Sequence, residues 1–204
     1  MKVFGHPMST CTRKVLATLA EKGHEAELVM VDLMKGEHKQ PAHLARHPFG
    51  VIPAIDDNGF VLYESRAIIR YLDQTLPGPA LTPTDPKDRA RMEQWMSVEQ
   101  SYFQSGAMKI IMQRMFASMA GKQPDEAIVD QGKDEAGKVL DIAAEVLKKG
   151  YFAQTGFSLA DICWMPYVQY LFTAGAGSLI TERPAVASWW ERVSSRPSWK
   201  KVAG

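Results

Sequence analysis

The chain is short of several features on which whole classes of protein depend. Its 204 residues include only two cysteines, Cys11 and Cys163, which lie far apart and form neither a CxxC pair nor a metal-ligand spacing. Both are therefore expected to be reduced thiols, and no metal site is predicted. The net charge of +1, from 24 basic and 23 acidic residues, provides no strong field for nucleic acid or an anionic membrane.

Long apolar segments are also missing. No stretch approaches the ~20 apolar residues that span a bilayer, and the first residues contain no apolar run of signal-peptide length. We therefore expect a cytoplasmic protein that binds neither membrane nor nucleic acid. What the chain does have is 46% hydrophobic residues, enough for the core of two small domains or one large one.

The first third of the chain alternates strand and helix patterns. The predicted strands are residues 2–5, 25–33, 54–55 and 60–63, the predicted helices are 10–22 and 65–75, and a polar segment at 35–47 is either helical or irregular. The last two strands form a hairpin, because Asn58-Gly59 is a strong hairpin signal. The order is βαβαββα, which predicts an α+β domain with a mixed four-stranded sheet.

Pro53 interrupts the apolar run from Val51 to Ile55, where a central strand could not accept it, because proline lacks the N–H that a ladder needs. A cis peptide bond between Ile52 and Pro53 would resolve this conflict. Such a turn leaves the N–H and C=O of Ile52 free to pair with the backbone of a small peptide ligand.

Beyond a proline-rich segment at 78–86 the strand patterns end. We predict a first domain at 1–77, a linker at 78–86 and an all-helical domain at 87–204. The predicted helices run from Asp85 to Met119 with a bend near Gly106, from Asp125 to Lys149, from Ser158 to Thr173, and from Pro184 to Ser195. Ser158 and Asp161 have the spacing of a capping box.

Five motifs in order resemble the cytosolic glutathione S-transferases, and most closely the phi class and its bacterial relatives. They are Phe-Gly-His-Pro-Met-Ser-Thr-Cys-Thr-Arg-Lys-Val-Leu at 4–16, Gly-Glu-His-Lys at 36–39, His-Pro-Phe-Gly-Val-Ile-Pro-Ala at 47–54, Tyr-Glu-Ser-Arg-Ala-Ile at 63–68 and Phe-Ser-Leu-Ala-Asp-Ile at 157–162. The resemblance spans the chain. It implies a thioredoxin-like first domain that binds glutathione and a helical second domain that contributes the pocket for an electrophile.

The resemblance assigns Ser9 to catalysis. Its hydroxyl, at the start of the first helix, would donate to the glutathione sulfur and stabilise the thiolate, aided by the positive end of the helix. From spacing alone Ser9 or Thr10 could equally be a simple helix cap. Cys11 leaves a second interpretation open, in which its thiol gives a glutathione-dependent reductase or peroxidase. Thr10 is a lesser candidate donor.

The same resemblance implies which residues of the first domain bind each part of glutathione. Ser65 and the amides of its helix suit the γ-glutamyl carboxylate, and Glu64 helps to orient the ammonium group. Ile52 would pair with the cysteinyl backbone beside Pro53. The residues expected at the glycine carboxylate and along the remaining backbone are His38, Lys39, Thr10 and Val51. Val51 replaces the frequent Gln or Lys of the family, so a weaker hold on glutathione is expected.

The electrophile is expected to meet Met8 and His6 from the first domain and apolar residues of the long helix. Those residues are Met108, Ile111, Met112, Met115 and Phe116, some of which must belong to the helix core. Phe49, on a loop, is expected to insert into a partner subunit and form a homodimer. The alternative to an enzyme is a ligand-carrying or assembly module with the same fold.

Overall fold

The chain divides into two compact units in a computed structural model that describes residues 1–203. The first unit comprises Met1–Leu81 together with the segment that begins at Pro197, and the second comprises Thr82–Arg196. The helical domain predicted at 87–204 therefore differs from the second unit at its C-terminal end. Helix α10 (Pro197–Ala203) packs on a helix of the first unit instead.

Specific polar contacts hold α10 in this place. Ser198 Oγ is hydrogen-bonded to the Glu21 carboxylate, and Lys201 pairs with Glu25. Trp199 is only 1% exposed. The sequence of this segment, a tryptophan followed by two lysines, does not indicate which unit it joins.

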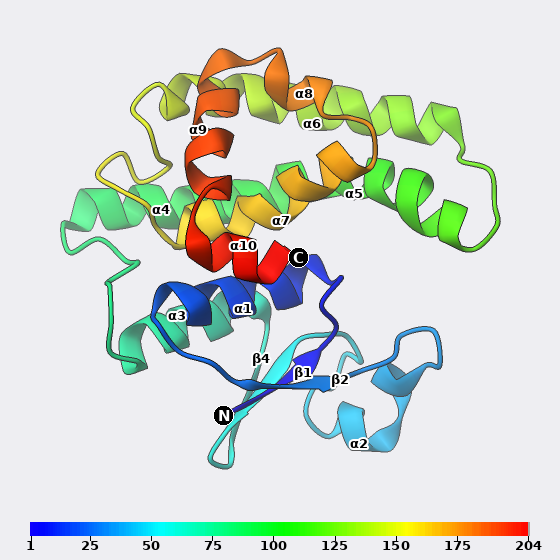
Figure 1. The fold of residues 1–204 in the computed structure, drawn as a ribbon, viewed down its shortest axis with the longest axis vertical. Coiled ribbons are helices and arrows are strands. Elements are labelled where there is room, and N and C mark those ends of the chain that lie inside the picture. Colours follow the sequence, from blue (N-terminus) through cyan, green and yellow to red (C-terminus); the bar gives the residue numbers. More distant parts are fainter. Residues whose placement is uncertain (204) are drawn as a thin grey trace. The chain divides into compact units, whose positions relative to one another are not determined.

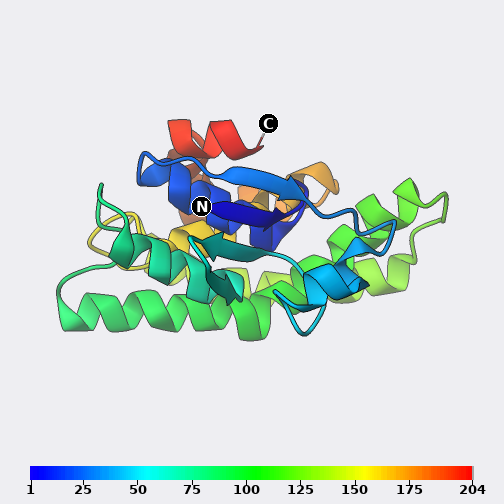
Figure 2. The ribbon, with the colours of Figure 1, turned by 90° about the horizontal axis from the view of Figure 1, so that it is seen from below.

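The first unit contains the predicted mixed sheet, and the βαβαββα order is confirmed. Its elements are β1 (Lys2–Gly5), α1 (Thr10–Glu21), β2 (Glu27–Met30), a 3₁₀ turn (Glu37–Lys39), α2 (Pro41–Leu44), β3 (Ala54–Asp57), β4 (Phe60–Tyr63) and α3 (Ser65–Thr75). The strand order is β2-β1-β3-β4; β1 and β2 are parallel, and the other two pairs are antiparallel. Figure 1 shows α1 and α3 side by side next to the sheet, and Figure 2 shows the sheet from below.

Local sequence explains these elements. Asn58 and Gly59 both take positive φ angles, 54° and 93°, and so form the tight turn of the β3–β4 hairpin. The apolar face of α3, with Ile68, Ile69 and Leu72, is completely buried. β2 is shorter than the predicted 25–33.

Every element within residues 82–196 is helical, as predicted. The helices are α4 (Pro86–Val98), α5 (Gln104–Ile111), α6 (Glu126–Leu147), α7 (Leu159–Thr173), α8 (Ser178–Thr181) and α9 (Pro184–Ser194), and π-helical segments lie at Glu99–Phe103 and Met112–Ala117. The long helix expected up to Met119 is thus continuous, but its α-helical hydrogen bonding is replaced by π-helical bonding in two segments. The Asp85 side chain caps α4 by accepting from the amides of Lys87 and Asp88.

Gly106, near which the sequence suggested a bend, allows close packing of two helices. A Cβ at Gly106 would lie 2.6 Å from the Ala136 amide nitrogen, and a Cβ at Gly132 would lie 2.7 Å from the Gly106 carbonyl oxygen. The two glycines therefore let the backbones of α5 and α6 approach each other. Figure 1 shows these helices side by side.

Asp161 is fully buried and joins three parts of the second unit. Its carboxylate accepts hydrogen bonds from the Ser158 amide at 2.9 Å, the Ser158 hydroxyl at 3.0 Å, Trp189 Nε1 at 2.8 Å and the Phe152 amide at 3.4 Å. The predicted capping box is thus present. Burial raises the pKa of Asp161 to about 6, although the hydrogen bonds act in the opposite direction.

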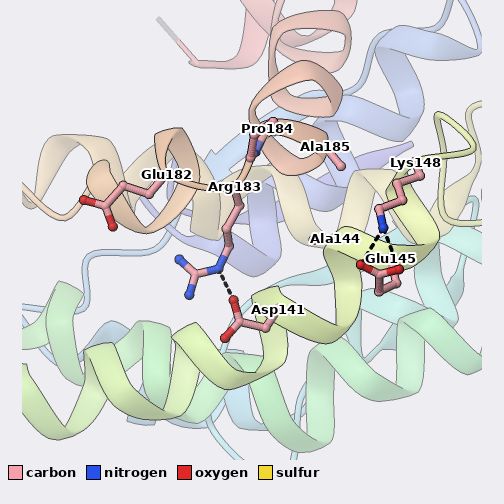
Figure 3. Close-up of a pocket in the computed structure, with 8 residues that line it drawn as sticks. All are labelled: Asp141, Ala144, Glu145, Lys148, Glu182, Arg183, Pro184 and Ala185. Carbon is pink, nitrogen blue, oxygen red and sulfur yellow. Dashed lines mark hydrogen bonds and ion pairs between the residues drawn. The ribbon is translucent and has the colours of Figure 1, made fainter.

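A pocket of about 500 Å³ lies in the second unit, between α6, α8 and α9, and contains none of the predicted site residues. Figure 3 shows Arg183 directed at Asp141 and Lys148 directed at Glu145, so these four charges pair within the pocket. Among the described residues no helix is both long and apolar enough to cross a bilayer.

Candidate active site

The sheet register brings three segments to one edge. Gly5, the last residue of β1, pairs with Met30, and Phe4 pairs with Ala54, the first residue of β3. Ala54 also pairs with Tyr63, the last residue of β4. The residues after β1, before β3 and after β4 therefore emerge together. These are the loop that ends at Ser9, the Ile52-Pro53 turn and the Glu64-Ser65 step.

Ser9 is the N-cap of α1. Its Oγ accepts a hydrogen bond from the Thr12 amide at 3.2 Å, so the capping role that the sequence left open is confirmed. This bond uses an oxygen lone pair and leaves the hydroxyl proton free to donate. Ser9 is partly exposed, so a ligand atom can approach it.

The loop that carries Ser9 is fixed on both sides. Arg13 Nε donates to the Pro7 carbonyl at 2.7 Å, and the Ser9 amide donates to the His6 carbonyl at 2.9 Å. Gly5 is required here, because a Cβ at this position would lie 2.5 Å from Thr12 Oγ1. The position of the Ser9 hydroxyl is therefore set by packing before any ligand binds.

The other residues predicted near the sulfur lie in the same region. Thr10 and Cys11 are the first two residues of α1 and are partly exposed, and Cys11 is a free thiol. Met8, also partly exposed, donates its amide to His6 Nδ1 at 3.2 Å. His6 therefore stabilises the loop and orients Met8.

The predicted cis bond between Ile52 and Pro53 is confirmed. The loop before it contacts the turn that contains His38 and Lys39. Lys39 Nζ donates to the Phe49 carbonyl at 3.2 Å. Gly50 has a φ of 60° and no room for a side chain, since a Cβ would lie 2.9 Å from the His38 carbonyl oxygen. The structure thus brings His38 and Lys39 together with the segment that contains Val51 and Ile52.

Glu64 has an unusual backbone conformation. Its φ of 72° and ψ of 108° are rarely adopted by a residue with a side chain, and such strain costs about 1 to 3 kcal/mol. Glu64 occupies the N-cap position of α3 without a side-chain capping bond, and Ser65 is the first residue of the helix. Ser65 is therefore inside the first turn of the helix and does not occupy the N-cap position. The first amides of α3 lack a side-chain cap, which suits an anionic ligand group.

Two histidines in this region were missed by the sequence interpretation. His43 Nε2 lies 2.7 Å from the Val51 carbonyl oxygen, and the rings of His43 and His47 stack with centroids 6.3 Å apart. His47 is 1% exposed; burial lowers its pKa, and the negative charge of Glu64 partly opposes this effect. The signal that could have found the pair is their i, i+4 spacing, which places two rings on one helical face.

The residues predicted for the electrophile differ in exposure. Met112 is 47% exposed, Met108, Met115 and Phe116 are partly exposed, and Ile111 is fully buried. Met112 to Ala117 form the second π-helical segment. Such segments are frequent at functional sites, because they change the direction of side chains along a helix.

Phe49 is 70% exposed, which is high for an aromatic side chain. It touches the ring of Tyr63 edge-on, with centroids 6.2 Å apart. Within the described residues no group of three or more His, Cys, Asp or Glu side chains has the geometry to hold a metal ion.

Both units match known protein families. The family described as "Glutathione S-transferase, N-terminal domain" matches residues 1–74, and "Glutathione S-transferase, C-terminal domain" matches residues 103–197. The chain is 39% identical to glutathione S-transferase F9 of Arabidopsis thaliana over 99% of this chain and 95% of the relative. The crystal structure of glutathione transferase F7 from Populus trichocarpa is 44% identical, covers 99% of this chain and 97% of its own, and has a TM-score of 0.94.

A maize relative was solved with a bound glutathione conjugate. Glutathione S-transferase I in complex with an atrazine glutathione conjugate is 32% identical, covers 99% of this chain and 95% of its own, and has a TM-score of 0.91. A thioredoxin-like unit followed by an all-helical unit is the two-domain architecture of the glutathione transferase fold. The chain belongs to the glutathione S-transferase family. It is a glutathione transferase with glutathione as co-substrate, and its resemblance to the phi class is confirmed.

Proposed function

We propose that the protein conjugates glutathione to small apolar electrophiles, with the Ser9 hydroxyl stabilising the glutathione thiolate. The observation that carries this proposal is the position of Ser9 on the sheet edge that also presents Ile52-Pro53 and Glu64-Ser65. The Ser9 oxygen accepts from Thr12, so its proton is available to a sulfur. The first unit binds glutathione in this assignment, and the second unit supplies apolar contacts to the electrophile.

The reaction needs an anion. A thiol with a pKa of ~8.5 is mostly protonated at neutral pH, and only the thiolate is strongly nucleophilic. Hydrogen bonding from Ser9 and the positive end of α1 stabilise the anion and so lower the thiol pKa. The thiolate then attacks an electrophilic carbon, a carbon–sulfur bond forms, and a leaving group such as chloride departs with the electron pair of the broken bond.

The tripeptide extends across the sheet edge from the sulfur. Its γ-glutamyl carboxylate meets Ser65 and the amides of α3, and Glu64 meets the ammonium group. The Ile52 backbone pairs with the cysteinyl residue, and Val51 contributes its main chain. His38 and Lys39 bind the glycine carboxylate, and Thr10 lies close to the sulfur.

Replacing Ser9 tests the catalytic role. Loss of the donor should reduce turnover of a generic aryl halide about tenfold or more. Ser9→Ala also removes a helix cap, whereas Ser9→Gly retains most of the capping preference. Equal losses of activity in both variants, with a larger loss of stability in Ser9→Ala, are expected from kinetics and thermal unfolding. Unchanged turnover in Ser9→Gly would exclude the role of Ser9.

Cys11→Ser tests the reductase or peroxidase alternative. Conjugation should persist in this variant, and disulfide reduction should be negligible in both the variant and the parent. A thiol-dependent disulfide reductase activity that vanishes with Cys11 would favour the alternative. Retention on immobilised glutathione without turnover of any electrophile would instead indicate a carrier or assembly module.

The electrophile contacts are assigned to Met8, Met108, Met112, Met115 and Phe116, with Ile111 supporting them from the helix interior. Methionine side chains repack easily, which suits varied apolar substrates. Activity on aryl halides, hydroperoxides and isothiocyanates would define the substrate class. We place the protein in the cytoplasm as a homodimer, in which Phe49 inserts into the partner subunit.

A further inference from the structure

We propose that His43 is a positioning residue of the glutathione site, which orients the Val51–Ile52 peptide so that the Ile52 N–H faces the tripeptide. This inference rests on the proposed pairing of Ile52 with glutathione. His43 lies on the short helix α2 and is 5% exposed. Its Nε2 is 2.7 Å from the Val51 carbonyl oxygen. A carbonyl oxygen can only accept, so Nε2 carries the proton and donates it.

The direction of this hydrogen bond fixes the peptide plane. The Val51–Ile52 peptide is trans, so its C=O and N–H point in opposite directions. Because the Val51 oxygen is held toward the buried ring of His43, the Ile52 N–H must point away from α2. The side chain of Val51 is apolar and adds no hydrogen bond. Any hydrogen bond to the ligand at this position must therefore come from the main chain, whose orientation His43 sets.

The histidine itself is held in place. Its ring stacks on that of His47 at an interplanar angle of 20°, and the His47 amide donates to the His43 carbonyl at 2.9 Å. The Gly50 amide donates to the His47 carbonyl at 2.8 Å. The loop is therefore anchored at Val51 by His43 and at Phe49 by Lys39. Such second-layer contacts keep a binding group in its productive geometry.

The test compares three substitutions at His43. His43→Phe fills the ring volume without a donor. His43→Gln places an amide nitrogen close to the position of Nε2 and keeps the donor, and His43→Asn places its nitrogen near Nδ1, too short to reach the Val51 oxygen. His24→Phe is the matched control, because His24 Nε2 also contacts a carbonyl, that of Pro77 at 3.2 Å, on an exposed surface.

Calorimetry with glutathione and steady-state kinetics provide the readouts. His43→Phe and His43→Asn should raise the Kd and the KM for glutathione about five- to tenfold, the effect of one lost hydrogen bond. The KM for an aryl halide should stay within about twofold of the parent value, since general loosening of the protein would alter both. His43→Gln and His24→Phe should keep the parent affinity for glutathione.

Other outcomes overturn the inference. If His43→Phe and His43→Asn bind glutathione like the parent, or if His43→Gln is as weak as His43→Asn, the donor at Nε2 has no positioning role. An equal rise in KM for both substrates would indicate a purely structural residue. If the parent protein itself fails to bind glutathione in the calorimeter, the proposed function fails first, and this inference fails with it.

Discussion

Val51 is the residue at which the sequence resemblance predicts the clearest departure from the family pattern. Its side chain is 47% exposed beside the Ile52-Pro53 turn, at a position where the resemblance led us to expect a glutamine or a lysine. The valine offers only its backbone. In the proposed site, the side chain at position 51 therefore decides whether glutathione gains a side-chain hydrogen bond here.

Val51→Gln should tighten glutathione binding. An added side-chain hydrogen bond contributes about 0.5 to 1.5 kcal/mol, so the Kd for glutathione should fall roughly two- to tenfold in calorimetry. Ile142→Gln, an exposed β-branched residue of α6, serves as the control and should leave the Kd unchanged. An unaltered or higher Kd in Val51→Gln would show that the position makes no side-chain contact with the tripeptide.

The sequence predicted those single residues that have a strong local signature. The turn at Asn58-Gly59 and the proline at 53 follow from the conformational limits of their residue types. His43 was not predicted, because a histidine in a polar segment has no local feature that announces a hydrogen bond to a carbonyl eight residues later. Ser9 was left between two roles because a cap and a thiolate donor need the same hydroxyl at the same place.

Helices α5 and α6 illustrate what a helical pattern cannot predict. A glycine inside a helix normally weakens it relative to alanine by about 1 kcal/mol, so Gly106 suggested a bend. The structure gives it a partner, Gly132, that lies 26 positions away in the sequence. Long-range packing of this kind is invisible to a local pattern, whereas the helices themselves were predicted well.

Gly132→Ala should destabilise the second unit despite the better helix propensity of alanine. The new Cβ would lie 2.7 Å from the Gly106 carbonyl oxygen, which belongs to the backbone and cannot move cheaply. We expect a loss of about 1 to 3 kcal/mol in urea unfolding. Gly137→Ala is the control on the same helix. Its Cβ would be 3.4 Å from the flexible end of Arg183, so it should be neutral or stabilising. The reverse ranking would contradict the close helix crossing.

Asp161 should make the stability of the protein depend on pH. Its pKa is raised from 3.8 to about 6 by burial, so the folded chain binds this proton more tightly than the unfolded chain. The contribution of this proton to the free energy of unfolding is therefore fully present below about pH 4 and is lost as the pH rises through 6. Asp161→Asn removes this titration and also two of the accepting positions.

Unfolding of the parent and of Asp161→Asn at pH 5 and pH 7.5 would measure this effect. The variant should be less stable at both values, and the difference should be about 1 kcal/mol larger at pH 5. Asp125→Asn, the same exchange at the exposed cap of α6, is the control. A difference that grows toward pH 7.5 would show that the hydrogen bonds outweigh burial at Asp161.

At the level of the complete protein, the proposed dimerisation depends most directly on Phe49. A side chain that is 70% exposed in one chain would be covered in the proposed homodimer. Phe49→Ala should raise the dissociation constant of the dimer about tenfold or more in sedimentation velocity, because buried aromatic anchors dominate such interfaces. Met34→Ala, at a methionine that is 92% exposed after β2, should have no effect. A parent protein that sediments as a monomer would refute the proposal.

Helix α10 has a consequence for how the protein is made. Because synthesis runs from the N-terminus, residues 82–196 leave the ribosome before Trp199 does. The first unit therefore spends most of translation without its last helix, and the part of α1 that binds Ser198 stays uncovered during that time. The first unit, although encoded first, gains helix α10 only after residues 82–196 have been synthesised.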